Sequence, residues 1–275
     1  MLINAIELRD NVEKCIEKDV ERGLSLLIIN ASDDKASERY VNMKKKICNK
    51  NGIVCVVLKF EETCTQDEII EYIKKSQHNY SGVLVQSPLY DHLNYNEIVE
   101  YIEPSKDVDG LTIFNQGAIY NAEYKGIRTC TALGVSLLLS YNEIDVKGKL
   151  VVMVGRGKMV ADPLAKKLEY KGATVVKIHT KTEDEVAKML ISNADIIISC
   201  VGKDMSHIIN PNIAKNVEAL IGVGFRYEDG KQLQDFNVND NWPEEVKITS
   251  NTNGTGLATL AALLLNLAKC EDMQY

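Results

Sequence analysis

The sequence predicts an α/β fold in which mainly parallel sheets are covered by helices. Continuous apolar runs of strand length alternate along the chain with segments that have helical periodicity. This alternation occurs in two series, and the second series begins at Lys149. Strands that alternate with helices are typical of parallel sheets with both faces covered. The length of 275 residues fits two such domains or one large one.

The first series begins with a helical segment and contains three apolar runs. The expected elements are a helix over 5–22, a strand over 24–29, a helix over 37–49, a strand over 53–58, a helix over 66–76 and a strand over 82–85. Asn51-Gly52 after the second helix is typical of a helix end. The region 104–120 is rich in loop-forming residues, and 131–141 is expected to form a connecting helix.

The second series contains four further apolar runs and ends in a helix. The expected strands are 150–154, 173–178, 194–199 and 219–223. A helix is expected between the first two of them, reaching about Tyr170, and an apolar helix over 256–268 closes the chain. The two series together predict two α/β domains.

Composition excludes several classes of protein. The net charge of −7 argues against a general nucleic-acid binder, which needs a basic face. The apolar stretch 257–267 is too short to span a bilayer, and the N-terminus lacks a signal-peptide pattern. The seven cysteines are scattered and the four histidines are not at metal-ligand spacing. Reduced thiols fit a reducing compartment, so we expect a cytoplasmic enzyme. From the charge, the apolar stretches and the histidine spacing we expect no nucleic-acid, membrane or metal partner.

The second helix of the first series carries the most informative pair of side chains. Tyr40 and Lys44 stand at i and i+4, so both project from the same helix face. An aromatic ring beside a primary amine suits a flat heterocycle that undergoes proton transfer. In the alternative interpretation, Lys44 belongs with Lys45, Lys46 and Lys50 to a solvated basic face.

A glycine turn opens the first helix of the second series. Gly155-Arg156-Gly157 directly follows a predicted strand, and Ala161 stands where a third small residue would let helix and strand approach. This is a variant of the dinucleotide-binding fingerprint. The first glycine allows the tight turn, the second admits a pyrophosphate, and the helix N-terminus supplies amide donors. A plain tight turn between strand and helix is the alternative.

The end of the next strand indicates which dinucleotide binds. An NAD site usually carries an Asp or Glu there, but this strand ends at His179 and Thr180 with flanking lysines and no acid. Together with Arg156, these groups form a cradle for a ribose phosphate, which favours NADP over NAD. Cys200-Val201-Gly202 follows the third strand and would place small backbone groups against the ribose and nicotinamide.

Two more segments place polar side chains where a ligand could meet them. Gln86 stands at the C-terminal end of a predicted strand, where ligands bind in open α/β sheets. Asp107 and Asp109 lie on opposite sides of an extended loop that ends at Gly110. An aspartate there can hold the amino group and ring N–H of a pterin by paired hydrogen bonds. The alternative is turn formation before Gly110.

Together these segments resemble the bifunctional methylenetetrahydrofolate dehydrogenase/methenyltetrahydrofolate cyclohydrolase family. The matching motifs occur in order over nearly the whole chain. They are Ser37-x-x-Tyr40-x-x-x-Lys44, Val85-Gln86-x-Pro88-Leu89, Lys106-Asp107-Val108-Asp109-Gly110, Cys130-Thr131-x-x-Gly134, Gly155-Arg156 and Gly254-x-Gly256-x-x-Thr259.

The resemblance implies a fold and an activity. The fold would be two α/β domains flanking a cleft, with a folate-binding catalytic domain of 1–127 plus 255–275 and a Rossmann-like NAD(P)-binding domain of 128–254. The enzyme would oxidise 5,10-methylenetetrahydrofolate with NADP, or with NAD, and hydrolyse the methenyl product to 10-formyltetrahydrofolate. Its partners would be tetrahydrofolate derivatives and a second copy of the chain in a homodimer.

The resemblance also implies roles for individual residues. Lys44 would handle protons as water adds to the methenyl bridge, and Gln86 would hydrogen-bond to this lysine. Tyr40 would pack on the folate ring, and Asp109 would anchor the pterin. Further substrate contacts would come from Pro88, Leu89, Gly254 and Gly256. The implied cofactor-binding positions are Gly155, Arg156, Gly157, Met159, Val160, His179, Thr180, Cys200, Val201, Gly202 and Thr259.

The chain departs from the family pattern at several positions. An aspartate common in the family is Gly222 here, and segment 249–257 lacks three prolines of the family's loop. A member with only one of the two activities is therefore one alternative. The others are a shikimate dehydrogenase-like oxidoreductase with two domains, and a binding or regulatory protein that keeps the fold without turnover.

Overall fold

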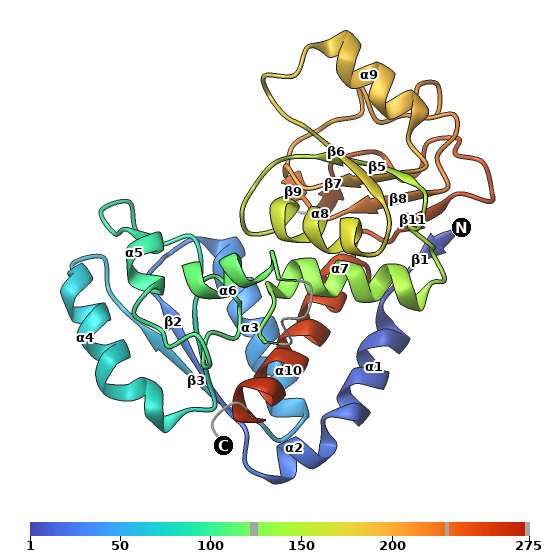
Figure 1. The fold of residues 1–275 in the computed structure, drawn as a ribbon. Helices are drawn as coiled ribbons and strands as arrows, with labels where there is room; N and C mark the ends of the chain where they lie inside the picture. Colours follow the sequence, from blue (N-terminus) through green and yellow to red (C-terminus); the bar gives the residue numbers. More distant parts are fainter. Residues whose placement is uncertain (122–125, 229–230, 273–275) are drawn as a thin grey trace. The chain divides into compact units, whose positions relative to one another are not determined.

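The computed structural model describes residues 1–121, 126–228 and 231–272, and it forms two compact units (Figure 1). We name each unit after its parallel sheet. The three-stranded unit consists of Asp10–Cys130 and Leu260–Tyr275, and the six-stranded unit of Met1–Arg9 and Thr131–Thr259.

The three-stranded unit is built around the parallel sheet β3-β2-β4. β2 (Ser25–Asn30) is the central strand and pairs with β3 (Val54–Lys59) and β4 (Gly82–Val85). Its middle residues are fully buried, as a strand covered on both faces requires. The helices of this unit are α2 (Glu17–Glu21), α3 (Lys35–Lys50), α4 (Gln66–Ser76), α5 (Tyr95–Val99) and α6 (Ile113–Ala118), with a 3-10 turn η1 (Gln77–Asn79).

Helices cover both faces of this sheet. Isoleucines of α4 pack with Leu27, Ile29 and Val85 on one face. On the other face, α10 (Thr255–Asp272) comes so close to β4 that a Cβ on Gly82 would lie 2.9 Å from Leu267. Figure 1 shows α4 and α5 on the side of the sheet opposite to α3 and α10. The core of the unit therefore lies on both faces of β2.

Local sequence signals account for where these helices begin and end. Asp34 caps α3 by accepting a hydrogen bond from Ser37 N at 2.7 Å. Thr65 and Glu68 form a reciprocal capping box at the start of α4. Gly52 follows α3 with φ of 73°, a conformation that glycine adopts without steric cost.

The six-stranded unit is a parallel α/β sheet with the strand order β1-β11-β8-β7-β5-β6. All pairs within it are parallel. The strands are β1 (Leu2–Ile3), β5 (Leu150–Val154), β6 (Thr174–Ile178), β7 (Ile196–Ser199), β8 (Ala219–Gly222) and β11 (Lys247–Thr249). The strand order reverses beside β5, where open α/β sheets form a crevice at their carboxyl ends.

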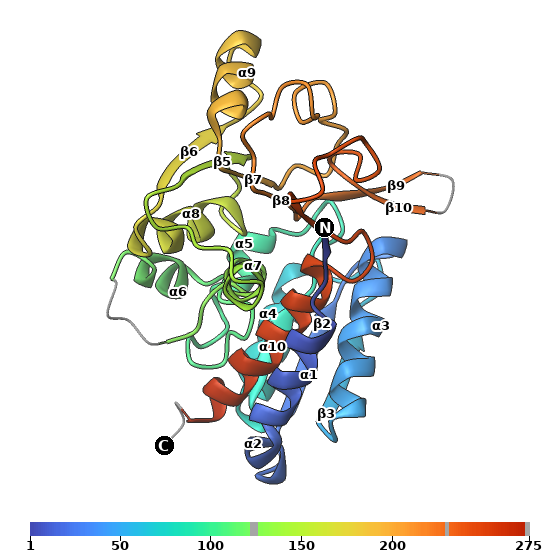
Figure 2. The ribbon, with the colours of Figure 1, turned by 90° about the vertical axis from the view of Figure 1, so that its right-hand side faces the viewer.

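Helices cover this second sheet as well. α9 (Asp184–Asn193) packs on one face through Ala187 and Ile191, while α7 (Cys130–Tyr141) and α8 (Ala161–Tyr170) lie on the other (Figure 1). An antiparallel hairpin of β9 (Phe225–Glu228) and β10 (Lys231–Gln234) follows β8 and extends from the sheet in Figure 2.

The predicted α/β class and the seven predicted strands are confirmed, with boundaries that differ by at most two residues. Some elements were not predicted. The helix expected over 5–22 is divided at Ile16 into α1 (Ile6–Cys15) and α2. The loop-rich region 104–120 contains α6 and a bridge between Val83 and Asp107. β1 and β11 are too short to leave a periodic pattern.

The compact units differ from the expected domains at the N-terminus. Residues 1–9 lie with the six-stranded unit, because β1 pairs with β11 at its edge. The other boundaries fall at 130/131 and, within α10, at 259/260. Assignment of folate and dinucleotide binding to separate domains stays a prediction. Among the described residues, no helix is long and apolar enough to span a membrane.

Candidate active site and cofactor loops

Lys44 lies on the buried face of α3. This face carries Ser37, Val41, Ile47 and Cys48 at helical spacing, and Lys44 is only 7% exposed among them. The basic side chains that neighbour it in sequence, Lys45, Lys46 and Lys50, are exposed. The solvated-face interpretation is therefore wrong for Lys44 and right for its neighbours.

The Lys44 amine faces two polar groups of the same unit. Lys44 Nζ donates a hydrogen bond to Gln86 Oε1 at 3.0 Å and lies 3.9 Å from Asp109 Oδ2. Gln86 follows β4 directly, and its backbone N–H donates to Ile29 O at 2.8 Å. Its side-chain Nε2 donates to Ser87 O at 2.8 Å. These contacts fix the amide so that its oxygen faces the lysine.

The loop that carries Asp109 runs beside β4. Val83 N donates to Lys106 O at 2.7 Å and Val108 N donates to Val83 O at 3.3 Å, so the loop adds to the sheet like a short strand. Asp107 and Asp109 stand on either side of Val108 in this segment and contact different groups. Asp109 reaches Lys44, and Gly110, with φ of 66°, turns the chain afterwards.

Asp107 takes the turn-forming role that was the alternative for this loop. Its carboxylate accepts hydrogen bonds from Thr112 N at 2.8 Å and Asn115 Nδ2 at 3.0 Å. Burial raises the pKa of Asp107, although these hydrogen bonds oppose the shift. The two acids of the Lys-Asp-Val-Asp-Gly motif therefore have different partners, and a ligand-binding role for Asp109 stays a prediction.

Three residues around Asp109 were not predicted. Asn266 Nδ2, on α10, donates to Val108 O at 2.9 Å and to Arg128 O at 2.6 Å. Cys130 Sγ donates to the same Val108 oxygen at 3.0 Å. Burial, and next the negative charge of Asp109, raises the pKa of both Cys130 and Tyr95. Asn266 left a signal in the sequence, because it is an isolated amide in an apolar helix.

The other predicted substrate residues surround Lys44 in sequence or follow β4. Tyr40 is half-buried on α3, one turn before Lys44. Pro88 is exposed, and Leu89 packs against the cluster of apolar side chains that covers β2. Roles for these three in ligand binding stay predictions.

In the six-stranded unit, the glycine turn combines a positive φ at Gly155 with open space at Gly157. Gly155 has φ of 122°, and its N–H donates to Ile178 O at 2.9 Å. A Cβ on Gly157 would have no atom within 4 Å, so the turn is open at that point. Val160 precedes α8 and provides no side-chain cap, and Arg156 and Met159 are exposed.

Strand register brings the predicted phosphate cradle to one level of the sheet. Val154 is the register partner of Ile178 on β6, so Arg156 and Thr180 both stand two residues beyond paired positions. Both are exposed. The backbone of His179 is held by Thr182, whose Oγ1 accepts from His179 N at 3.0 Å. Lys177, one of the lysines that flank the predicted cradle, forms an ion pair with Asp162.

The remaining predicted cofactor residues lie in two other segments of this unit. Cys200 N donates to Val154 O at 2.8 Å, which places the Cys200–Gly202 loop directly beside Gly155. Gly202 has φ of 68°. Thr259, on α10, donates its hydroxyl to Thr255 O at 2.8 Å.

Gly254 and Gly256 differ in their surroundings. A Cβ on Gly254 would lie 2.5 Å from Ser250 O, so glycine is required there for the chain to enter α10. A Cβ on Gly256 would have no atom within 4 Å. Open space of this kind is where a ligand could approach the backbone closely.

The chain is similar to known proteins over nearly its whole length. Family models of the tetrahydrofolate dehydrogenase/cyclohydrolase match the chain twice, as the catalytic domain over residues 3–109 and as the NAD(P)-binding domain over residues 129–275. The bifunctional protein FolD of Sulfurovum sp. is 36% identical over 273 residues, covering 96% of this chain and 95% of that protein. The chain belongs to the tetrahydrofolate dehydrogenase/cyclohydrolase family.

Solved structures agree with this membership. The bifunctional FolD dehydrogenase/cyclohydrolase from Campylobacter jejuni is 32% identical, with a TM-score of 0.91 over 100% of this chain and 99% of that chain. The Trypanosoma brucei family member complexed with NADP and an inhibitor shares the fold, with a TM-score of 0.90 at 24% identity over 100% and 98%. The predicted family, fold class and kind of enzyme are confirmed, and the shikimate dehydrogenase-like alternative is not.

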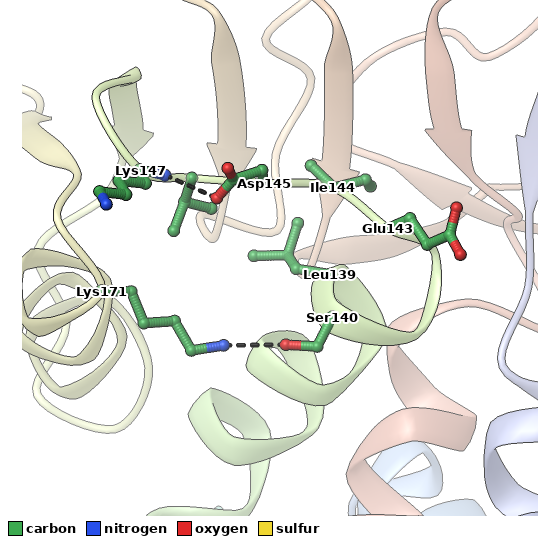
Figure 3. Close-up of a pocket in the computed structure, with 8 residues that line it drawn as sticks. Leu139, Ser140, Glu143, Ile144, Asp145, Lys147 and Lys171 are labelled. Carbon is green, nitrogen blue, oxygen red and sulfur yellow. Dashed lines mark hydrogen bonds between the residues drawn. The ribbon is translucent and has the colours of Figure 1, made fainter.

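A cavity of the family's NAD(P)-binding domain contains none of the predicted site residues. It has a volume of about 460 Å³ and lies where α7 and α8 end (Figure 3). Lys171 points across it and donates to Ser140 Oγ at 2.8 Å. Burial lowers the pKa of Lys171, while the negative ends of two helix dipoles favour a cation there. We interpret this contact as a structural link between the ends of α7 and α8.

The described residues contain no group of three or more histidines, cysteines, aspartates or glutamates that could hold a metal ion. All seven cysteines are free. The candidate site residues are an amine, an amide and a carboxylate in the three-stranded unit, and separately glycine-containing loops in the six-stranded unit; their roles stay predictions.

Proposed function

We propose that this enzyme oxidises 5,10-methylenetetrahydrofolate with NADP and hydrolyses the resulting methenyl compound to 10-formyltetrahydrofolate. The observation that carries the proposal is the buried Lys44 amine, held 3.0 Å from Gln86 Oε1 and 3.9 Å from Asp109 Oδ2. A buried lysine costs free energy unless its polar atoms are satisfied. Its retention at the carboxyl end of a parallel sheet supports a chemical role rather than a packing role.

Hydrolysis of the methenyl group requires two proton movements near one carbon. The oxygen of water bonds to the methenyl carbon and gives up both of its protons, which leaves a formyl C=O on N10. One proton ends on N5 as the bond from that carbon to N5 breaks, and the other is released to solvent. We assign these transfers to Lys44 Nζ, because Gln86 Oε1 fixes the direction in which the amine points. Positioned acid–base groups contribute about a hundred- to ten-thousand-fold to a rate.

Asp109 and Tyr40 would hold the pterin against this amine. Asp109 is partly exposed, so its carboxylate can accept hydrogen bonds from a ligand as well as face Lys44. Tyr40 lies one turn from Lys44 on the same helix and would stack on the ring. Pro88 and Leu89, after Gln86, and the open backbone at Gly256 would complete the substrate contacts.

Unsatisfied buried atoms near the end of the sheet also support a polar ligand. Asn30 Oδ1, on the last residue of β2, and Ser37 Oγ, on α3, have no hydrogen-bond partner among the described residues. Buried polar groups are nearly always satisfied in native proteins. A substrate with several N–H and O–H groups would satisfy them.

The six-stranded unit fits a dinucleotide phosphate. Gly155 and Gly157 leave room for a pyrophosphate at the start of α8, where first-turn amides have no side-chain cap. Arg156 and Thr180, level with each other and without an acid at the strand end, would bind the 2′-phosphate of NADP. Met159, Val160, His179, the Cys200–Gly202 loop and Thr259 would line the remainder. NADP supplies the hydride acceptor for the oxidation.

We further propose a homodimer in the cytoplasm. The family resemblance implies the dimer, and the free cysteines fit a reducing compartment. The molar mass in solution, measured by light scattering, tests the dimer directly.

Incubation with 5,10-methylenetetrahydrofolate and either NADP or NAD, while the methenyl absorbance is followed, tests the proposed function. A transient methenyl signal that decays with NADP supports both activities. A signal that accumulates shows dehydrogenase without efficient hydrolysis. No methenyl compound with either dinucleotide contradicts the proposal and favours a binding protein.

A further inference from the structure

Two consecutive side chains at the end of the β9–β10 hairpin are buried and were not among the predicted site residues. Gln234 is the last residue of β10 and Asp235 follows it, and they are 4% and 0% exposed. Consecutive residues of an extended chain point to opposite sides. Each of these two side chains therefore reaches a different loop of the six-stranded unit.

Asp235 holds the loop after β7. Its Oδ2 accepts hydrogen bonds from Ser199 Oγ at 2.6 Å and from Val201 N at 3.0 Å, and its Oδ1 accepts from Lys203 N at 3.0 Å. No lysine or arginine forms an ion pair with this carboxylate among the described residues. Its charge is stabilised by backbone and hydroxyl donors, so the shape of the loop depends on it.

Gly224 shows how closely this carboxylate is enclosed. A Cβ at position 224 would lie 2.5 Å from one Asp235 oxygen and 2.7 Å from the other. The loop that Asp235 holds is the one that carries Cys200, Val201 and Gly202. Burial, and next the charge of Asp235, raises the pKa of Cys200 to about 12.

Gln234 holds the opposite side, where β11 ends. Its Nε2 donates to Thr249 O at 2.8 Å, and its Oε1 accepts from Thr249 Oγ1 at 3.1 Å. Thr249 Oγ1 in turn accepts from Gly222 N at 2.8 Å. A Cβ on Gly222 would overlap Gln234 Oε1, so the amide occupies the space that a side chain at position 222 would need.

The same strand holds the loop between β11 and α10 at a second point. Gln232 Nε2 donates to Asn251 O at 3.0 Å, and this contact is two residues away from the Gln234–Thr249 contact on each segment. Thr255 Oγ1, at the start of α10, donates to Gly222 O at 2.8 Å. Segment 249–254 contains no proline, so side-chain hydrogen bonds provide the constraint on its backbone.

We propose that Gln234 and Asp235 are positioning residues, which we call the Gln234–Asp235 brace. Asp235 sets the Cys200–Gly202 loop for the dinucleotide, and Gln234 sets the 250–254 loop for the folate. The two assignments rest on the proposed function. The brace couples each loop to one side chain, so a substitution in either residue should affect one ligand and spare the other.

Binding measurements on the full chain test this separation. The dissociation constants of NADP and of tetrahydrofolate are measured by calorimetry for the wild type, Asp235→Asn and Gln234→Leu. In Asp235→Asn, the amide N–H group faces a backbone N–H of Val201 or Lys203 in place of an accepting oxygen. We therefore expect NADP binding to weaken about five- to hundred-fold. Tetrahydrofolate binding should be unchanged. Gln234→Leu leaves Thr249 O without its donor, and we expect the reverse pattern.

Asp204→Asn is the matched control for Asp235→Asn, because Asp204 is an exposed acid in the same loop. It should leave both constants unchanged. If Asp235→Asn or Gln234→Leu fails to fold, Ser199→Ala and Thr249→Val remove a partner from each side and must show the same two patterns. Equal weakening of both ligands by each variant, or no weakening by any, overturns the brace.

The outcome is distinguishable from failure of the proposed function. A wild type that binds both ligands without turning over would contradict the proposed activities, and the binding constants of the variants would still decide the brace. A turnover measurement adds a second readout, because hydrolysis of the methenyl compound needs no dinucleotide. Asp235→Asn should therefore leave the KM and kcat of hydrolysis unchanged.

Discussion

Lys44 Nζ and Gln86 Oε1 lie 3.0 Å apart at the carboxyl end of β4, and the other end of the amide is held by Ser87 O. Because Gln86 Nε2 is used in that second contact, the oxygen and not the nitrogen of the amide faces the amine. The direction of the lysine side chain is therefore set by a residue that directly follows β4, a strand of the same sheet.

Gln86→Leu should lower cyclohydrolase activity by about 100-fold, because a misplaced catalytic group of this kind costs roughly that factor. Hydrolysis of the methenyl compound, followed by its absorbance, measures the effect. Gln77→Leu is the matched control, since Gln77 is another buried glutamine of the same unit, bonded to Tyr101 O and Glu103 N. An equal loss in both variants would show that the effect of Gln86 is structural.

Arg156→Ala should raise the KM for NADP and leave the KM for NAD nearly unchanged, because the guanidinium would contact only the extra phosphate. Loss of a charge-assisted hydrogen bond of about 1.5–3 kcal/mol predicts a change of at least tenfold in the ratio of the two constants. Lys188→Ala, which removes an exposed charge from α9, serves as the control. Equal changes for NAD and NADP would contradict this role of Arg156.

Gly134→Val should destabilise the six-stranded unit by about 1–3 kcal/mol through overpacking. A Cβ at this position would lie 2.6 Å from the carbonyl carbon and oxygen of Ala258, so α7 and α10 touch through their backbones. Chemical denaturation measures the change in the free energy of unfolding. Gly117→Ala is the opposite case, since a Cβ there meets no atom within 4 Å, and it should stabilise by about 0.4–1 kcal/mol. Equal effects of the two variants would contradict the packing account.

Asn266→Leu should lower the free energy of unfolding by about 1–3 kcal/mol, because one carbonyl group loses its donor and a second keeps only the Cys130 thiol. The carbonyl groups belong to Val108, which precedes Asp109, and to Arg128, which lies two residues before the start of α7. Urea unfolding monitored by circular dichroism measures this loss. A variant as stable as the wild type would show that solvent or another group satisfies these carbonyls.

Much of the candidate site could be predicted because its residues sit at recognisable points of the chain. Gln86 and Gly155 each directly follow an apolar run that predicts a strand. Both could therefore be placed at the carboxyl ends of parallel strands, where ligands bind in open α/β sheets. The burial of Lys44 could not be derived from charge alone, since Lys45 and Lys46 beside it are exposed. The Tyr40-x-x-x-Lys44 motif was the feature of the sequence that distinguished Lys44 from these neighbours.

The brace and the short strands could not be predicted for a physical reason. Gln234 and Asp235 act through hydrogen bonds with residues that are 15 to 36 positions away in the chain, and a polar pair at the end of a hairpin has no periodic signature. β1 and β11 depend on each other across nearly the whole sequence. Such pairings are products of tertiary structure and not of local pattern.

The most direct test of the account compares Lys44→Met with Lys45→Met in hydrolysis of the methenyl compound. Lys44 is buried against Gln86, whereas Lys45 is its exposed neighbour on α3, so both variants remove one amine from the same helix. We expect a loss of about a hundred- to ten-thousand-fold for Lys44→Met and unchanged hydrolysis for Lys45→Met. Wild-type hydrolysis rates in a folded Lys44→Met protein would contradict the central claim.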